Sequence, residues 1–278
     1  MPRNLLVTAL ATPYKRGKLD VASFERLVES QTDGSVDRLL LFGTTGEKAF
    51  VTEKEREQCV EICQKVAHVV PFWMGIGGFC VADYVAQARF AEDACASAIL
   101  VSPPSFYKCT PLGFCQLVQQ IARAVHVPLV LYNAPSRCNY VLPKSVLKKL
   151  ADLHVVGVKD AGTDTQFAKQ IGACTNLLCG NDNLLQSWLQ IGAKGVVSVA
   201  SNVAPRLVRK VLDGQNSKEF ALLCKALECQ LNPIAIKYLL YKKGVFDRFS
   251  MRLPLTPASA KTQKTVDEIW EAIADECK

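Results

Sequence analysis

The sequence is poor in histidine, with three in 278 residues, and its twelve cysteines include no Cys-x-x-Cys spacing. A zinc site built from such pairs is therefore not predicted. Cys59 and Cys63 are one helical turn apart, but no matching His pair accompanies them, so we expect free thiols and no metal. The basic residues are scattered, mostly in pairs, and never form a run of five or more, which argues against nucleic-acid binding despite a formal charge of +7.

The sequence also has no long apolar segment. The N-terminal run, residues 5–11, is short and is interrupted by Thr8, so neither a signal peptide nor a membrane span is predicted. Without a signal peptide, twelve cysteines in a chain of this length do not indicate a secreted disulfide scaffold. We therefore expect a cytoplasmic protein with no membrane partner.

Short apolar runs recur along the chain, and each is followed by a longer amphipathic segment. These runs span residues 4–11, 37–43, 69–77, 97–103, 127–133, 155–160, 176–182 and 195–201. They are apolar on both faces, as parallel strands covered by helices are. Eight such units predict an α/β fold, a (β/α)8 TIM barrel over residues 1–215, with a C-terminal helical extension over 216–278.

The main alternative fold is a doubly wound sheet. That fold usually has Gly-x-Gly-x-x-Gly after its first strand, which is absent here, and 75-GIGG-78 after the third strand lacks the final glycine. Helix signals fit the barrel. Thr52 and Glu55 form a capping-box pattern, and Pro111, Pro143 and Pro205 stand where first helical turns begin. We further expect Pro233 to break the helical pattern of residues 218–244, and a last helix near 262–276.

The three histidines all directly precede predicted strands, as 68-HVVPFW-73, 126-HVPLVLY-132 and 154-HVVGVK-159. In a (β/α)8 barrel, active sites lie at the carboxyl ends of the strands and stabilising features at the amino ends. The histidine positions therefore argue against a His-based metal site, a Ser-His-Asp triad and a Cys-His pair.

The carboxyl ends of the predicted strands carry a different set of side chains. Thr44 and Thr45 follow the second strand, Tyr107 follows the fourth, Tyr132 and Arg137 follow the fifth, and Lys159 ends the sixth. A lysine after an apolar strand has two interpretations: a solvated strand end, or a desolvated amine in a pocket. Burial would lower the pKa of such an amine and make it a nucleophile toward a carbonyl carbon. The convergence of these groups on one barrel mouth favours the pocket.

Three motifs make the sequence recognisable: 43-GTTGE-47, 132-YNAPSR-137 and 156-VGVKDA-161. Together with 195-GVVSVASNVAP-205, 232-NPIAIK-237 and 252-RLPLTP-257, they resemble, in order and over nearly the whole chain, the dihydrodipicolinate synthase / N-acetylneuraminate lyase family of class I aldolases. The resemblance implies a barrel with a C-terminal helical extension, a homotetramer built as a dimer of dimers, and no cofactor.

The resemblance also implies roles for individual residues. Lys159 would form the Schiff base with pyruvate, and Tyr132 would relay protons. Thr44 would link Tyr132 by hydrogen bonds to Tyr107, which the family takes from a neighbouring subunit. Thr45 would hold the pyruvate carboxylate. The backbone near Gly180 and Val197 would line the pocket around Lys159.

Within the family, Arg137 favours the synthase branch. There an arginine receives the carboxylate of L-aspartate-4-semialdehyde, which condenses with pyruvate in lysine and diaminopimelate biosynthesis. Two alternatives stay open: an aldolase that cleaves N-acetylneuraminate or a keto-deoxy sugar acid, and a non-catalytic relative. The chain departs from the synthase pattern after Arg137, and Tyr107 aligns only with a one-residue shift. Lys48 and Phe79 stand where polar groups accompany lysine inhibition in the family, so we expect weak or no inhibition by lysine.

Overall fold

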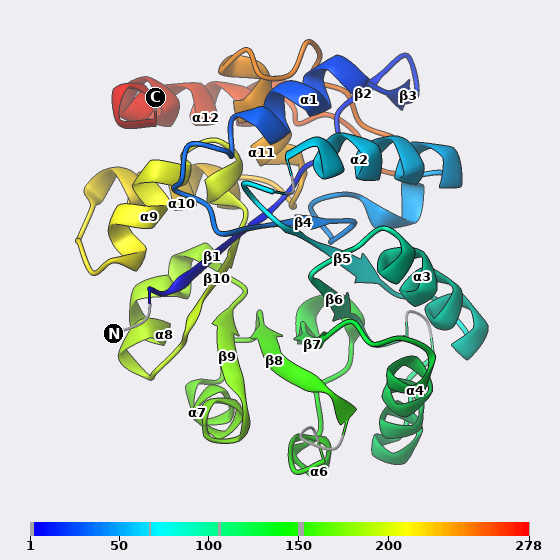
Figure 1. The fold of residues 1–278 in the computed structure, drawn as a ribbon. Coiled ribbons are helices and arrows are strands. Elements are labelled where there is room, and N and C mark those ends of the chain that lie inside the picture. Colours follow the sequence, from blue (N-terminus) through cyan, green and yellow to red (C-terminus); the bar gives the residue numbers. More distant parts are fainter. Residues whose placement is uncertain (1–2, 67, 105–106, 150–152, 278) are drawn as a thin grey trace. The chain divides into compact units, whose positions relative to one another are not determined.

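Eight strands, each within one of the predicted apolar runs, form a closed barrel. The computed structural model describes residues 3–66, 68–104, 107–149 and 153–277. Neighbouring strands follow the order β1-β10-β9-β8-β7-β6-β5-β4, and helices lie between them along the chain (Figure 1). The predicted fold class is confirmed, with helices following the last strand.

The chain divides into two compact units, which we describe separately. The first comprises Met1–Pro71 and Ser198–Lys278, and the second comprises Phe72–Val197. Helices beyond residue 215 belong to the same unit as the first strand. The expected boundary between residues 215 and 216 stays a prediction.

The first unit contains two barrel strands, a hairpin and helices from both the N-terminal and the C-terminal part of the chain. Its elements are β1 (Leu5–Ala9), β2 (Tyr14–Lys15), β3 (Lys18–Leu19), α1 (Val21–Glu29), β4 (Arg38–Leu41), η1 (Lys48–Phe50), α2 (Glu53–Val66), η4 (Ala200–Asn202), α9 (Pro205–Leu212), α10 (Lys218–Glu228), α11 (Ile234–Lys242), α12 (Ala260–Ile273) and η5 (Ala274–Cys277). Strands β1 and β4 pair in parallel, with Thr8 opposite Leu39.

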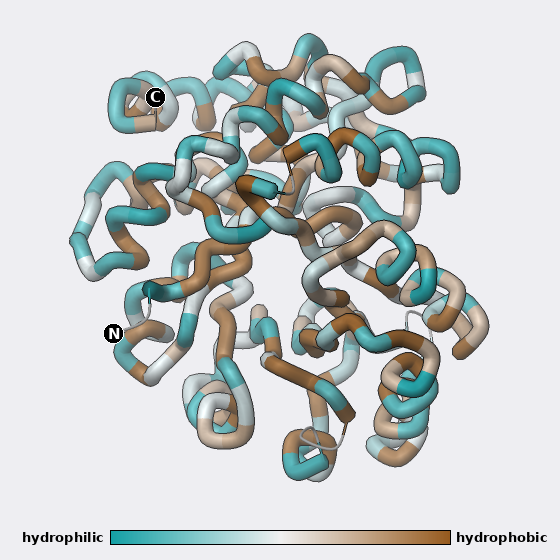
Figure 2. Tube along the Cα trace, in the orientation of Figure 1, coloured by the Kyte–Doolittle hydropathy of each residue, from teal (hydrophilic) through white to brown (hydrophobic). Residues whose placement is uncertain are grey.

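The second unit alternates strands and helices. Its elements are β5 (Phe72–Ile76), α3 (Val81–Asp93), β6 (Ala98–Val101), α4 (Pro111–Ala124), β7 (Leu129–Asn133), α5 (Pro135–Cys138), α6 (Lys144–Leu147), β8 (Val155–Asp160), α7 (Thr165–Cys174), β9 (Asn176–Cys179), η3 (Asp182–Leu184), α8 (Leu185–Gln190) and β10 (Gly195–Ser198), whose last residue belongs to the first unit. Every residue of β5, β6 and β7 is buried, which confirms strands that are covered on both faces. Figure 2 shows the same pattern, with hydrophobic residues concentrated on the strands and hydrophilic residues interspersed along the helices.

The local helix signals are mostly confirmed. The Thr52 N–H donates to Glu55 Oε2 at 3.0 Å, and the Glu55 N–H donates to Thr52 Oγ1 at 3.4 Å, which is the predicted capping box. Pro111 and Pro205 are the first residues of α4 and α9, whereas Pro143 is the residue before α6. Pro233 separates α10 from α11, as predicted.

The short hairpin of β2 and β3 was not predicted. Its two-residue turn is formed by Arg16 and Gly17, with φ of 53° and 76°, which is the left-handed geometry that suits a tight hairpin turn. Strands of two residues are too short to show alternation in the sequence, so only the turn could have indicated them.

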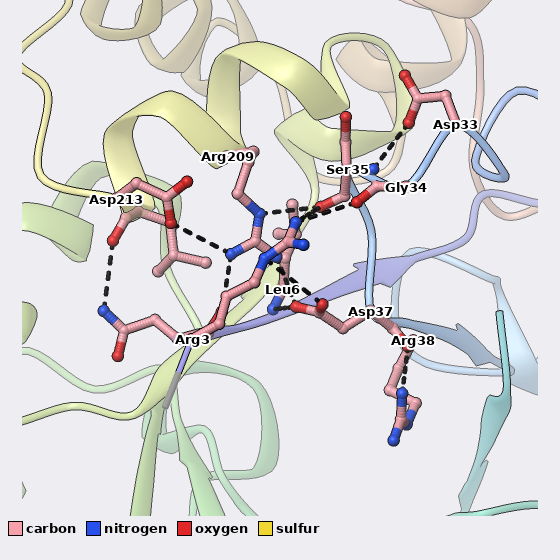
Figure 3. Close-up of polar contacts among 11 residues, drawn as sticks. Arg3, Leu6, Asp33, Gly34, Ser35, Asp37, Arg38, Arg209 and Asp213 are labelled. Atoms are coloured by element: carbon pink, nitrogen blue, oxygen red, sulfur yellow. Dashed lines mark hydrogen bonds and ion pairs between the residues drawn. The ribbon is translucent and has the colours of Figure 1, made fainter. Parts of the chain in front are cut away.

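A cluster of ion pairs ties the amino end of β4 to the rest of the first unit (Figure 3). The Asp37 carboxylate accepts the Leu6 backbone N–H at 2.7 Å and an Arg209 N–H at 2.5 Å, and Arg3 lies 3.8 Å away. Arg209 also donates to the carbonyl oxygen of Ser35 at 3.0 Å. The cluster thus joins β1, β4 and α9 at the end of the strands where stabilising features are expected.

Candidate active site

Lys159 is buried at the carboxyl end of β8. Lys159 is 7% exposed, and it pairs with Tyr132 of β7 in the parallel register of the two strands. The Lys159 Nζ lies 4.6 Å from the centroid of the Tyr132 ring, over its face. The solvated interpretation of this lysine is therefore wrong, because strand pairing holds the amine against an aromatic ring inside the unit.

Burial changes the protonation of this amine. Desolvation lowers the pKa of Lys159 from 10.5 to about 8; the carboxylate of Asp182 opposes the shift, and the guanidinium of Arg137 adds to it. At pH 7 such a shift raises the fraction of neutral amine by roughly two orders of magnitude. A neutral amine is the form that attacks a carbonyl carbon.

Gly180 follows β9 and closely approaches Lys159. A Cβ atom on Gly180 would lie 3.0 Å from Lys159 Cε, and equally close to the Asp160 carbonyl oxygen and Ala161 Cβ. Any larger residue would therefore push against the lysine side chain. This contact gives a physical reason for a glycine at a position that the sequence associated with the pocket.

Two polar residues next to the Tyr132–Lys159 pair brace it. Asn133 and Asp160 form the next pair in the register of β7 and β8, and Asn133 Nδ2 donates to Asp160 Oδ1 at 2.8 Å. The same carboxylate oxygen accepts the Gly162 N–H at 2.8 Å, and Asn133 Oδ1 accepts the Leu142 N–H at 2.9 Å. Because Asp160 is 1% exposed, these bonds fix the strand ends that carry Tyr132 and Lys159. Neither Asn133 nor Asp160 was predicted from the sequence to support the site.

The second unit contains three more of the predicted site residues, Arg137, Val197 and Tyr107. Arg137 lies on the short α5, which begins at Pro135 directly after β7, and its side chain is exposed; its charge acts on the Lys159 pKa. Val197 is buried in β10, the strand next to β9. Tyr107 is 70% exposed in the connection between β6 and α4.

Thr44 and Thr45 belong to the first unit, in the loop between β4 and η1. The Thr44 carbonyl oxygen accepts the Glu47 N–H at 3.1 Å. Thr45 is 3% exposed, and its hydroxyl oxygen accepts a hydrogen bond from Asn232 Nδ2 at 3.0 Å. The hydrogen bonds expected from Thr44 to Tyr132 and Tyr107 stay predictions.

Asp182 and Cys179 also act electrostatically on Lys159, and neither was predicted from the sequence as a candidate site residue. Asp182 is 7% exposed, and its negative charge favours the protonated form of Lys159. Cys179 is fully buried at the end of β9, and burial raises the pKa of its thiol to about 12, so the sulfur stays protonated. The signal available in the sequence was their position at the end of the seventh apolar run.

Two further features of the described residues concern metal ligands and long apolar helices. Over residues 3–66, 68–104, 107–149 and 153–277, no group of three or more His, Cys, Asp or Glu side chains is placed to hold a metal ion. In the same part of the chain, no helix has both the length and the apolar character needed to cross a bilayer. His126 illustrates the histidine prediction, since it precedes β7 at the amino end and its side chain is fully exposed.

Comparison with known proteins identifies relatives over almost the whole chain. The model of the dihydrodipicolinate synthetase family matches residues 2–273. A 4-hydroxy-tetrahydrodipicolinate synthase of Alkaliphilus oremlandii is 34% identical over 94% of this chain and 96% of its own length.

Solved structures agree with the sequence relatives. The crystal structure of dihydrodipicolinate synthase from Thermotoga maritima superimposes with a TM-score of 0.92 at 31% identity, covering 99% of both chains. A monomeric dihydrodipicolinate synthase variant gives a TM-score of 0.91 at 30% identity and covers 96% of both chains.

Proposed function

The chain belongs to the dihydrodipicolinate synthetase family, and on that premise we propose that it is a 4-hydroxy-tetrahydrodipicolinate synthase. Its substrates are then pyruvate and L-aspartate-4-semialdehyde, and its nucleophile is Lys159. The observation that carries this proposal is the buried Lys159 amine over the Tyr132 ring, with its pKa lowered to about 8.

The chemistry follows from that amine. The neutral Lys159 Nζ attacks the ketone carbon of pyruvate, and water leaves as the C=N bond of the imine forms. The protonated imine withdraws electrons from the neighbouring methyl carbon, which loses a proton to give an enamine. The enamine carbon then attacks the aldehyde carbon of the semialdehyde, which forms the new carbon–carbon bond and leaves an alkoxide to be protonated.

Tyr132 is the group closest to hand for the proton transfers. Its ring faces Lys159 Nζ and its residue is 8% exposed, so its hydroxyl works in a largely water-excluded environment. A positioned acid–base group contributes roughly 10²–10⁴-fold to the rate of such steps. We assign to Thr44 the relay between Tyr132 and Tyr107, and to Thr45 a hydrogen bond to the pyruvate carboxylate. Gly180 and Val197 line the pocket in this proposal.

The direct test is reduction with borohydride in the presence of pyruvate, followed by intact mass and peptide mapping. We expect one reduced pyruvate adduct, on Lys159. An adduct on another lysine, or none, contradicts the proposal. The exposed Lys194, which directly precedes β10, serves as an internal control in the same peptide map.

Arg137 separates the synthase from the lyase alternative. A guanidinium forms two parallel hydrogen bonds to a carboxylate, which suits the carboxylate of the semialdehyde. Arg137→Ala should leave pyruvate trapping intact, and should lower kcat/KM for the semialdehyde by on the order of tenfold or more. The exposed Arg123 on α4 provides the control variant Arg123→Ala. Cleavage of N-acetylneuraminate by the wild type, with no turnover of the semialdehyde, would favour the lyase.

Three further expectations belong to the same proposal. The family resemblance favours a homotetramer, which sedimentation would test against the monomeric state that one similar protein adopts. A cytoplasmic location is expected for a biosynthetic enzyme of this kind. Lysine should inhibit weakly or not at all, because the 69% exposed Phe79 offers no acceptor for an ammonium group.

A further inference from the structure

A buried ion pair joins two segments that are far apart in the sequence. Lys237 on α11 donates to Glu47 Oε1 at 2.5 Å across a separation of 190 residues, and both side chains are 1% exposed. Both residues lie in the first unit. Neither of them was assigned a role in the chemistry described above.

Burial makes this pair costly. Desolvation raises the pKa of Glu47 and lowers the pKa of Lys237, and each partner's charge opposes the shift of the other. Buried ion pairs of this kind stabilise a fold no better than well-packed neutral side chains of similar volume. Stability alone therefore gives little reason for two charges at these positions. A better reason is that the pair fixes the position of the segment that carries Glu47.

What the pair defines is the loop of residues 43–47, which carries Thr44 and Thr45. Glu47 ends this loop in the left-handed conformation, with φ of 52°, and its N–H donates to the Thr44 carbonyl oxygen. Gly46 allows close packing, since a Cβ there would lie 3.1 Å from the Leu10 carbonyl oxygen. Shifting the Glu47 side chain would therefore move the backbone that bears both threonines.

The segment that supplies Lys237 holds the same loop at a second point. Asn232, which precedes α11, donates from Nδ2 to Thr45 Oγ1 at 3.0 Å. A hydroxyl that accepts this bond keeps its own proton for donation elsewhere. The bond therefore orients Thr45 as a donor, which is what an anionic carboxylate requires.

The Lys237 ammonium group also lies over an aromatic ring. Its Nζ lies 4.5 Å from the centroid of the Tyr14 ring, and the Arg252 guanidinium lies 4.0 Å from the same centroid. Arg252 is fixed in turn by two hydrogen bonds to Glu55, of 2.8 and 2.5 Å. The Tyr14 ring thus contacts the same ammonium group that donates to Glu47.

We propose that Asn232 and Lys237 are positioning residues for the pyruvate carboxylate, acting through Thr45 and Glu47 of the loop. The C-terminal helical segment is then part of the substrate-binding apparatus and not only a cover for the barrel. This inference rests on the proposed function, because it assumes that Thr45 meets the carboxylate of pyruvate.

The test compares pyruvate with acetone, a ketone that has no carboxylate, in borohydride trapping on Lys159. The main variant is the double substitution Glu47→Gln and Lys237→Met, which removes both buried charges while keeping the side-chain volumes. We expect the pyruvate concentration for half-maximal trapping to rise about tenfold, with the saturating rate nearly unchanged. Trapping of acetone should not change, because it makes no use of Thr45.

A second variant and a control keep the test decisive if the double variant folds poorly. Asn232→Ala removes the donor to Thr45 and should shift the pyruvate concentration for half-maximal trapping in the same direction. The control is Arg209→Met, which breaks the ion pair at the amino end of β4. It should lower the melting temperature without changing the pyruvate concentration for half-maximal trapping.

The outcomes separate the two proposals. Unchanged half-saturation in folded double and Asn232→Ala variants overturns the positioning role alone. Equal losses for pyruvate and acetone overturn it as well, because they indicate a general structural defect. A wild type that traps acetone but shows no response to pyruvate, or that forms no adduct at all, overturns the proposed function and the positioning role with it.

Discussion

Strand β4 is anchored at both ends by ion pairs within the first unit, and the two anchors differ in exposure. At the amino end, Asp37 is 22% exposed and pairs with Arg209, which is 9% exposed, and with Arg3, which is 49% exposed. At the carboxyl end, Glu47 and Lys237 are each 1% exposed. Charges that keep some contact with water lose less hydration energy, so the amino-end cluster can stabilise the unit.

At the carboxyl end, the charges of Glu47 and Lys237 are both removed from water. This pair holds the loop of residues 43–47, which carries Thr44 and Thr45. In the second unit, the ionisable residues at the carboxyl end of β8 are buried as well, since Lys159 and Asp160 are 7% and 1% exposed. Buried ionisable groups thus gather where barrel enzymes have their chemistry. We therefore expect substitutions at the amino ends of the strands to alter stability, and substitutions at the carboxyl ends to alter activity.

The strongest test of this contrast is Lys159→Met against Lys194→Met. Loss of the nucleophile should lower kcat/KM by on the order of 10⁴-fold or more and abolish the pyruvate adduct, while the melting temperature stays near that of the wild type. Lys194 directly precedes β10 at its amino end and is exposed, so its substitution should alter neither. Residual turnover by Lys159→Met with an adduct elsewhere would show that the nucleophile is a different lysine.

The next largest effect is expected from Tyr132→Phe. This change removes the hydroxyl proton relay but keeps the ring beneath Lys159 Nζ, so kcat should fall by roughly 10²–10⁴-fold with a smaller change in the KM for pyruvate. Steady-state kinetics measure both parameters. Turnover near that of the wild type would mean that another group carries the proton.

At the amino end, Arg209→Met should act on stability. It leaves the Asp37 carboxylate without its nearest cation and frees the carbonyl oxygens of Asn4 and Ser35. The free energy of unfolding should fall by about 2–4 kcal/mol, measured by urea denaturation. Specific activity per folded molecule should be unchanged. A large change in KM would contradict the expectation that amino-end substitutions act on stability alone.

The smallest effect is the pH dependence of imine formation. Desolvation lowers the pKa of Lys159 to about 8, so the neutral fraction of the amine rises about tenfold between pH 7 and pH 9. The rate of trapping at low pyruvate should rise across this window and level off above it. A rate that keeps rising toward pH 10.5 would indicate an amine with the ordinary pKa.

Most of the fold could be predicted because its signals are local. The eight apolar runs, the Thr52–Glu55 capping box and the break at Pro233 each depend on residues within a few positions of one another. Burial of Lys159 in the candidate site could be predicted for the same reason, since Lys159 ends an apolar strand and 132-YNAPSR-137 is a compact motif. The hairpin of β2 and β3 was missed because two-residue strands show no period.

Local sequence patterns were enough to locate most strands and helices and to identify the residue types at the strand ends. Three features came from the folded chain: Lys159 Nζ faces the Tyr132 ring, a side chain on Gly180 would press on Lys159 Cε, and Lys237 reaches Glu47. The physical reason is that secondary structure depends on neighbouring residues, whereas desolvation and pairing of a charge depend on atoms that come together from distant segments.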